Sequence, residues 1–97
     1  MTPDQFKATL QDETPPAGTS LALQAMWYDA NGNWDEAHAK AQDQDDRTGA
    51  WVHAYLHRVE GDESNAGYWY RKAGRPHSQA TLADEWDEIV SELCSED

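Results

Sequence analysis

Apolar residues recur at intervals of three and four along most of the chain, the spacing of helices with one buried face. The stretch at residues 49–60 is apolar on most of its sides, so we expect it to be the central helix, contacted by several others. The pattern predicts an all-α fold, a compact right-handed array of about six short helices. These lie near residues 3–12, 19–30, 33–42, 49–60 and 63–73, and the last begins at Ser78 or Thr81 and runs to about Leu93.

Local signals mark the ends of these helices. Thr2 followed by Gln5 three positions later predicts a capping box at the start of the first helix. Gly61 and Asp62 predict a tight corner, since Gly ends one helix in the left-handed conformation and Asp caps the next. We expect one domain, residues 1–97, made of a docking helix with its linker, two helical pairs and a capping helix, at 1–18, 19–45, 46–75 and 78–94.

The last helix is expected to be amphipathic. Its inward stripe is formed by Leu82, Trp86, Ile89 and Leu93, which either closes the monomer or forms a symmetric homodimer. The opposite side is expected to present five carboxylates to solvent, from Asp84, Glu85, Asp87, Glu88 and Glu92. No basic residue follows Arg75, so the C-terminal end of this helix is disfavoured and should fray at residues 95–97.

The chain of 97 residues is strongly acidic, with 7 Lys and Arg against 19 Asp and Glu and a formal charge of −12. Such a surface repels phosphates and anionic lipid, which disfavours direct binding to nucleic acid or to a membrane. A protein or peptide partner, or a small molecule, fits this charge better. The simplest alternative is that the acidic excess keeps the protein soluble.

The single cysteine, Cys94, excludes an intrachain disulfide and a structural cysteine-based zinc site. The first residues show no apolar signal core and no Arg-rich transit character. No apolar run reaches the length of a transmembrane helix. We therefore expect a cytoplasmic protein.

A shift of 29 residues aligns the chain with itself at the end of one helix, at the corner and at the start of the next helix. Small residues at these places let two helices approach closely on either side of a Gly turn. The aligned pairs are Ala25 and Ala54, Gly32 and Gly61, Asn33 and Asp62, and Ala37 and Ala66.

The second copy, with Gly61, Ala66, Tyr70 and Ala73, resembles the tetratricopeptide class of helical repeats. The 29-residue spacing is shorter than the usual repeat of about 34, and Ala41 stands where that class has an aromatic residue in the first copy. The resemblance implies two helix-turn-helix pairs, with the first and last helices acting as caps.

Two longer segments, WYDANGNWDEAHAKAQ and GAWVHAYLHRVEGDESNAGYWYRKAGRP, look like a family of small stand-alone bacterial proteins of unknown function. The resemblance covers about residues 21–93. It implies a helical fold and a bacterial source and brings no activity with it.

His53 and His57 are four residues apart on one expected helix, the geometry by which two imidazoles share a metal ion. His38 or Glu60 can complete a three-ligand site. The alternative is that the histidines pack along the helix and hydrogen-bond to neighbours such as Asp29, Asp35 or Asn65. No zinc-protease motif, phosphate-binding loop or nucleophile elbow occurs, so we assign no catalytic residue and no cofactor and expect a non-enzymatic protein.

The basic residues concentrate in one region, formed by Arg58, Arg71, Lys72, Arg75 and His77. Beside the aromatic residues at 68–70, these cations can bind a carboxylate or phosphate, with Arg as a planar fork. The alternative is that they pair internally with Glu60, Asp62 or the acidic last helix.

A concave face with Tyr55, His57 and Tyr68 is the preferred candidate for a peptide or protein site, since exposed aromatic residues mark contact surfaces. The full candidate surface is His57, Tyr55, Tyr68, Arg58, Arg71 and Arg75. The sequence thus favours a protein-interaction module. The alternatives are a small-molecule or metal-binding protein that uses His53, His57 and residues 71–75, or an acidic mimic of nucleic acid.

Overall fold

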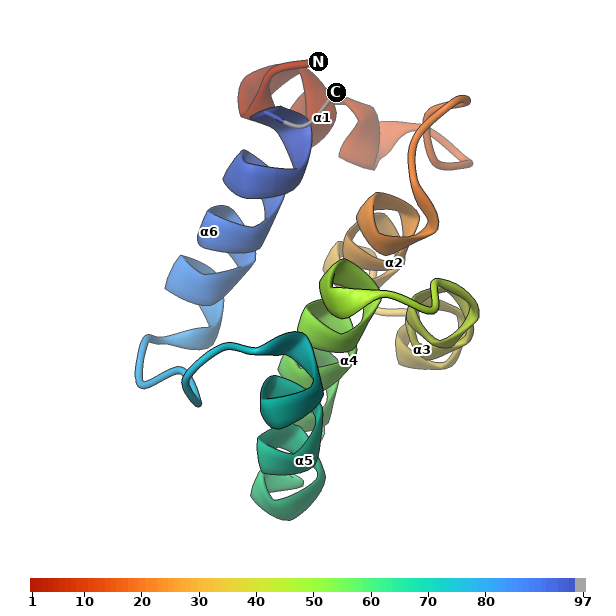
Figure 1. Ribbon diagram of the computed structural model, residues 1–97. Coiled ribbons are helices and arrows are strands. Elements are labelled where there is room, and N and C mark those ends of the chain that lie inside the picture. Colours follow the sequence, from red (N-terminus) through yellow and green to blue (C-terminus); the bar gives the residue numbers. More distant parts are fainter. Residues whose placement is uncertain (96–97) are drawn as a thin grey trace.

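The computed structural model describes residues 1–95 as six α-helices and one short 3₁₀ helix, η1 (Figure 1). Within these residues there is no β-strand, so the expected all-α class is confirmed. No helix among them combines the length and hydropathy needed to cross a membrane. The elements are α1 (Pro3–Ala8), η1 (Thr9–Gln11), α2 (Leu21–Ala30), α3 (Trp34–Asp43), α4 (Arg47–Val59), α5 (Glu63–Ala73) and α6 (Leu82–Ser95).

The helix starts follow the local capping signals. The Thr2 hydroxyl accepts the Gln5 N–H while the Gln5 side chain accepts the Thr2 N–H, so the predicted capping box is present. Asn33 and Asp62 cap α3 and α5 as expected. Asp46 caps α4 through the N–H of Gly49, so α4 begins at Arg47, two residues earlier than predicted.

Two helical pairs, α2 with α3 and α4 with α5, form the body of the fold. Their corners have the same construction: Gly32 and Gly61 have φ of 77° and 86°, and each is followed by the cap of the next helix. The four aligned alanines of the 29-residue repeat are all fully buried, namely Ala25, Ala54, Ala37 and Ala66. The repeat therefore occupies matching places in the two pairs, while the tetratricopeptide resemblance and the right-handed arrangement stay predictions.

Helix α4 lies at the centre of the molecule, with α2, α3, α5 and α6 around it (Figure 1). Every residue from Gly49 to His57 is buried. The expectation of a central fourth helix is confirmed. Because α4 is enclosed, its polar side chains His53 and His57 are buried as well.

Helix α6 packs on α4 and α2, and α1 packs on α6. Phe6 of α1 is fully buried, with its ring centroid 6.1 Å from that of Trp86. Lys7 adds an ion pair to Asp87 at 3.1 Å. The first helix is thus docked by one ring and one ion pair, as a helix too short to be stable alone requires.

The expected faces of α6 need one correction. Glu85, predicted to face solvent, is only 1% exposed, whereas Leu82 of the predicted inward stripe is 38% exposed. The helix is rotated so that Glu85 joins Ile89 and Leu93 on the buried side. Helix α6 extends through Ser95, and residues 96–97, the rest of the segment expected to fray, lie outside the described part of the chain.

Candidate metal centre

Three of the four histidines converge between α3 and α4. His38 comes from α3, and His53 and His57 come from successive turns of α4. One ring nitrogen from each residue can be chosen such that all three lie within 4.8 Å of one another. The centroid of the His53 ring is 4.5 Å from that of His38 and 4.9 Å from that of His57. The structure thus brings together the three histidines named from the sequence as a possible metal site.

The packing of α3 on α4 explains this convergence. Ala37 and Ala41 of α3 are buried, and their small side chains let the two helices approach closely. His38 follows Ala37, so its ring reaches the same face of α4 from which His53 and His57 project, four residues apart.

Two tryptophans hold the imidazole rings in place. Trp69 of α5 stacks on His53, with centroids 3.8 Å apart and ring planes 13° from parallel. Trp34 stacks on His38 at 4.9 Å and 17°, and its indole N–H donates to the Leu56 carbonyl at 2.8 Å. The rings therefore occupy defined orientations before any ligand binds.

His57 has a carboxylate partner. Its Nδ1 lies 2.9 Å from Oε1 of Glu60. When Nδ1–H donates to Glu60, the lone pair of the imidazole is on Nε2, and such carboxylate–histidine pairs are common around metal ions. Of the partners considered from the sequence, Asp29 accepts from Tyr55 and Asn65 donates to Asp62 instead.

The surroundings favour neutral histidines. Burial, together with the nearby His38, His57 and Lys72, lowers the pKa of His53 to about 4. Burial and the proximity of His57 also lower the pKa of His38, although Glu60 and Asp35 oppose that shift. Both imidazoles are neutral at pH 7, the form that carries a free lone pair.

Two carboxylates, those of Glu60 and Asp62, lie beside His57. His57, Glu60 and Asp62 form a second group whose ligand atoms lie within 4.8 Å of one another. Hydrogen bonds from the Asn65 backbone and side chain lower the pKa of Asp62, which keeps it ionised. His38 is the least buried of the three histidines.

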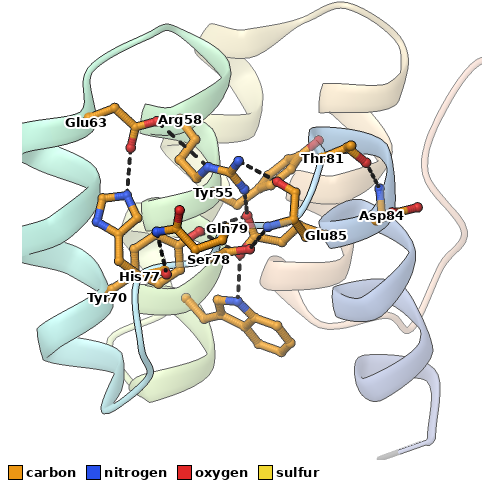
Figure 2. Close-up of polar contacts among 12 residues, drawn as sticks. Tyr55, Arg58, Glu63, Tyr70, His77, Ser78, Gln79, Thr81, Asp84 and Glu85 are labelled. Carbon is orange, nitrogen blue, oxygen red and sulfur yellow. Dashed lines mark hydrogen bonds and ion pairs between the residues drawn. The ribbon is translucent and has the colours of Figure 1, made fainter.

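A second polar cluster is buried around Glu85 (Figure 2). Arg58 donates to its Oε1 at 2.6 Å, and the Tyr70 hydroxyl lies 2.6 and 2.7 Å from its two oxygens. The Trp51 indole N–H donates to the same carboxylate at 3.3 Å. Burial and the bond to Glu85 raise the pKa of Tyr70, so this hydroxyl stays protonated as a donor. The cluster ties α6 to α4 and α5 and has a structural role.

Two arginines of the expected basic surface are already paired with carboxylates of the protein itself. Arg58 pairs with Glu85, and Arg75 pairs with Glu92 at 2.7 Å while its guanidinium stacks 3.5 Å from the Trp51 ring centroid. For these two arginines the alternative of pairing with the acidic last helix is confirmed. Arg71 makes no ion pair with any residue of the described chain.

The concave aromatic face expected from the sequence is not formed. Tyr55 is only 4% exposed and donates its hydroxyl to Asp29, and His57 is buried as well. Tyr68 alone of the three is exposed, at 45%. The prediction is wrong because Tyr55 and His57 belong to the central helix, which is enclosed by its neighbours.

The role of Trp34 and Trp69 as supports of the histidines was not predicted from the sequence. Trp34 is four residues before His38, a spacing that places both rings on one face of a helix. Trp69 gives no such signal, since its contact with His53 depends on how α5 packs on α4.

Comparisons of the chain with models of protein families, with curated proteins and with solved structures found no match. The resemblances of residues 21–93 to a bacterial family and of the helical pairs to tetratricopeptide repeats stay predictions from the sequence.

Proposed function

We propose that the protein binds a divalent transition-metal ion through the imidazoles of His38, His53 and His57. The convergence of three imidazoles from two helices carries this proposal. Imidazole nitrogen suits zinc, nickel and copper, and histidine is the commonest metal ligand in proteins.

The spacing of the rings is compatible with an ion after a small adjustment. Zinc binds imidazole nitrogen at about 2.0–2.1 Å, so two ligands of a tetrahedral ion lie about 3.4 Å apart. The three nitrogens lie within 4.8 Å of one another, so each pair of them must close by at most about 1.4 Å. His38 is the most exposed of the three, so a small shift of its ring along Trp34 disturbs the least packing. Three protein ligands leave a further position for water or an anion.

Charge also supports the proposal. An ion held by three neutral imidazoles keeps its double positive charge, which needs compensation in a partly buried site. Glu60 and Asp62 lie beside His57, and the whole chain has a formal charge of −12. Both features favour a cation at this place.

The protein-interaction module has less support. Tyr55 and His57, two of the three residues of the preferred concave face, are buried, which leaves Tyr68 as its main aromatic candidate. An acidic nucleic-acid mimic needs an unbroken exposed row on α6, but Glu85 is buried and Asp87 and Glu92 are in ion pairs. Metal binding is therefore the function that the geometry supports best.

Calorimetric titration of the metal-free, tag-free protein with Zn²⁺ and Ni²⁺ tests the proposal. We expect one ion per chain, and an affinity lowered by more than about 100-fold in His38→Gln, since even changes in outer-sphere partners lower metal affinity about 10- to 100-fold. His53→Phe keeps a flat ring against Trp69 without a lone pair and should lose the ion equally. His77→Gln is the matched control, because His77 pairs with Glu63 and takes no part in the cluster.

Two results would overturn the proposal. One is the absence of saturable binding in the wild-type chain. The other is unchanged affinity in both His38→Gln and His53→Phe, which would place the ion among the carboxylates. Far-ultraviolet circular dichroism of each variant separates loss of ligand from loss of fold.

A further inference from the structure

A cleft of about 280 Å³ lies beside the histidine cluster, where the end of α3, the start of α4 and α5 meet. His53 and Trp69 form one wall, so the cleft borders the candidate metal centre. Arg47, Lys72, Gln42 and Asp45 are among its polar lining. Neither Arg47 nor Lys72 makes an ion pair with a carboxylate of residues 1–95.

The cations of this cleft are unusual for so acidic a chain. Within residues 1–95, ion pairs with carboxylates engage four of the seven Lys and Arg residues: Lys7, Lys40, Arg58 and Arg75. Of the three cations left without one, Arg47 and Lys72 line this cleft. The ammonium of Lys72 lies 5.0 Å from the Trp69 ring centroid and 5.4 Å from that of Tyr68, so two rings hold it at the cleft wall.

We infer that this cleft binds a small anion that carries a carboxylate or phosphate group, between Arg47 and Lys72. Arg47 supplies a planar fork that matches either group in two-point fashion, and Lys72 supplies a compact charge. The cleft volume of about 280 Å³ lies just below the range of about 300–1,000 Å³ for ligand pockets. A small organic acid or phosphate ester fits better than a large cofactor.

Two acidic residues of the lining limit the affinity. The Asp46 carboxylate accepts the Gly49 N–H at 2.8 Å and the Gln44 side-chain amide at 3.2 Å, so its charge is partly satisfied by the start of α4. Asp45 has no such bond among the described residues, and it opposes an anion. We therefore expect weak, salt-sensitive binding, with a dissociation constant of about 1 mM at low ionic strength.

The position of His53 couples the two sites. An ion bound by the histidines adds positive charge at the wall of the cleft, so the anion should bind the metal-loaded protein more tightly. The anion site itself does not need the metal, because Arg47 and Lys72 are present in the metal-free chain.

The test is a titration of ¹⁵N-labelled, metal-free protein, cleared of chelator, with inorganic phosphate and separately with succinate. Sodium chloride at matched ionic strength is the blank. We expect saturable amide shifts around Gly49, His53 and Lys72. Arg47→Met and Lys72→Met should each weaken binding by about tenfold, as expected for loss of one charge-assisted contact. Lys40→Met is the matched control, since Lys40 pairs with Glu36 on α3.

Saturation by either anion supports the inference, and the tighter one identifies the acid group. Equal shifts with chloride, or unchanged affinity in both Arg47→Met and Lys72→Met, would overturn it. His38→Gln separates the two proposals, because it should lose zinc and keep phosphate. A wild-type chain that binds phosphate but no metal would refute the metal proposal alone, and the reverse result would refute the anion site alone.

Discussion

Glu85 and Glu92 lie on the same helix and each pairs with an arginine, but burial separates their energetic roles. The Glu85 and Arg58 side chains are 1% and 11% exposed, whereas those of Glu92 and Arg75 are 45% and 34% exposed. Removing one partner of a buried pair leaves an uncompensated charge in the interior, while an exposed pair is replaced by water and salt.

We therefore predict that Glu85→Ala lowers the free energy of unfolding by about 3–5 kcal/mol, because Arg58 and the Tyr70 hydroxyl lose their acceptor. Glu92→Ala should lower it by only about 0–1 kcal/mol. Urea denaturation followed by circular dichroism measures both. Similar losses in the two variants would contradict the structural role given to the Glu85 cluster.

Asp29 gives a prediction on pH. Burial raises the pKa of its carboxyl above 3.8, although the hydrogen bond from Tyr55 partly opposes the shift. The folded state then binds this proton more tightly than the unfolded state, so stability from Asp29 is present below pH 3.8 and is lost as the pH rises through the folded pKa.

In the Asp29→Asn variant the side chain does not ionise, so this loss of stability at higher pH is absent. The amide oxygen can still accept the hydrogen bond from the Tyr55 hydroxyl. The stability of the variant relative to the wild type should thus improve from pH 3.5 to pH 7, as measured by urea denaturation at both values. A difference that does not change with pH, or that changes in the opposite sense, would contradict the assigned environment of Asp29.

The burial of Glu85 was not predicted from the sequence, because it depends on distant residues. Glu85 is three residues after Leu82 and four before Ile89, so its spacing is compatible with the inward face. A carboxylate at that position was assigned to solvent because its burial requires partners. Those partners, Arg58 and Tyr70, are 27 and 15 residues away in the chain, so no local sequence pattern predicts their contact with Glu85.

Among the elements, the corner between α3 and α4 depends on Gly49. A Cβ added to this residue would overlap the carbonyl oxygen of Gln44, a backbone atom that cannot move away easily. The Gln44 side chain is itself fixed, since its Oε1 accepts the Ala22 N–H at 2.8 Å. The first turn of α4 is thus packed against the end of α3 without space for a methyl group.

Gly49→Ala should therefore lower the free energy of unfolding by about 3 kcal/mol, at the upper end of the usual overpacking range. Gly67→Ala on α5 is the matched control, because its Cβ would meet its nearest neighbour, His77 Nδ1, at an ordinary 3.5 Å. That variant should be more stable than the wild type by about 0.5–1 kcal/mol, the usual gain of Ala over Gly in a helix. Thermal unfolding of both variants measures the two changes in stability. Equal changes would contradict the close approach of α3 and α4 at Gly49.

The helices themselves were largely predictable because their signals are local. Caps such as Thr2, Asn33 and Asp62 act within one turn, so the sequence around them contains the whole interaction. The start of α4 was placed two residues late because Asp46 lies within a charged run in which several residues can cap. The choice depends on where Gly49 meets α3, which is a tertiary contact.

On the scale of the whole molecule, the candidate centre is assembled by packing. The spacing of His53 and His57 on one helix was visible in the sequence, and His38 could be named as a third ligand. The aromatic partner surface was predicted wrongly, although α4 was expected to be central, since a helix enclosed by four others cannot also present Tyr55 to a partner. Periodicity gives the faces of a helix, but the burial of each face is decided by its neighbours.

The most direct test of the metal centre is X-ray absorption spectroscopy at the zinc edge on the tag-free protein loaded with one equivalent of Zn²⁺. We predict three imidazole nitrogens at about 2.0–2.1 Å from the zinc ion, with a light atom from water or an anion as the remaining ligand. The His38→Gln protein should show one imidazole fewer. Two results would contradict the assignment of the ion to His38, His53 and His57. One is a set of ligands made only of oxygen, and the other is a Cys94 sulfur bound at about 2.3 Å from the zinc ion.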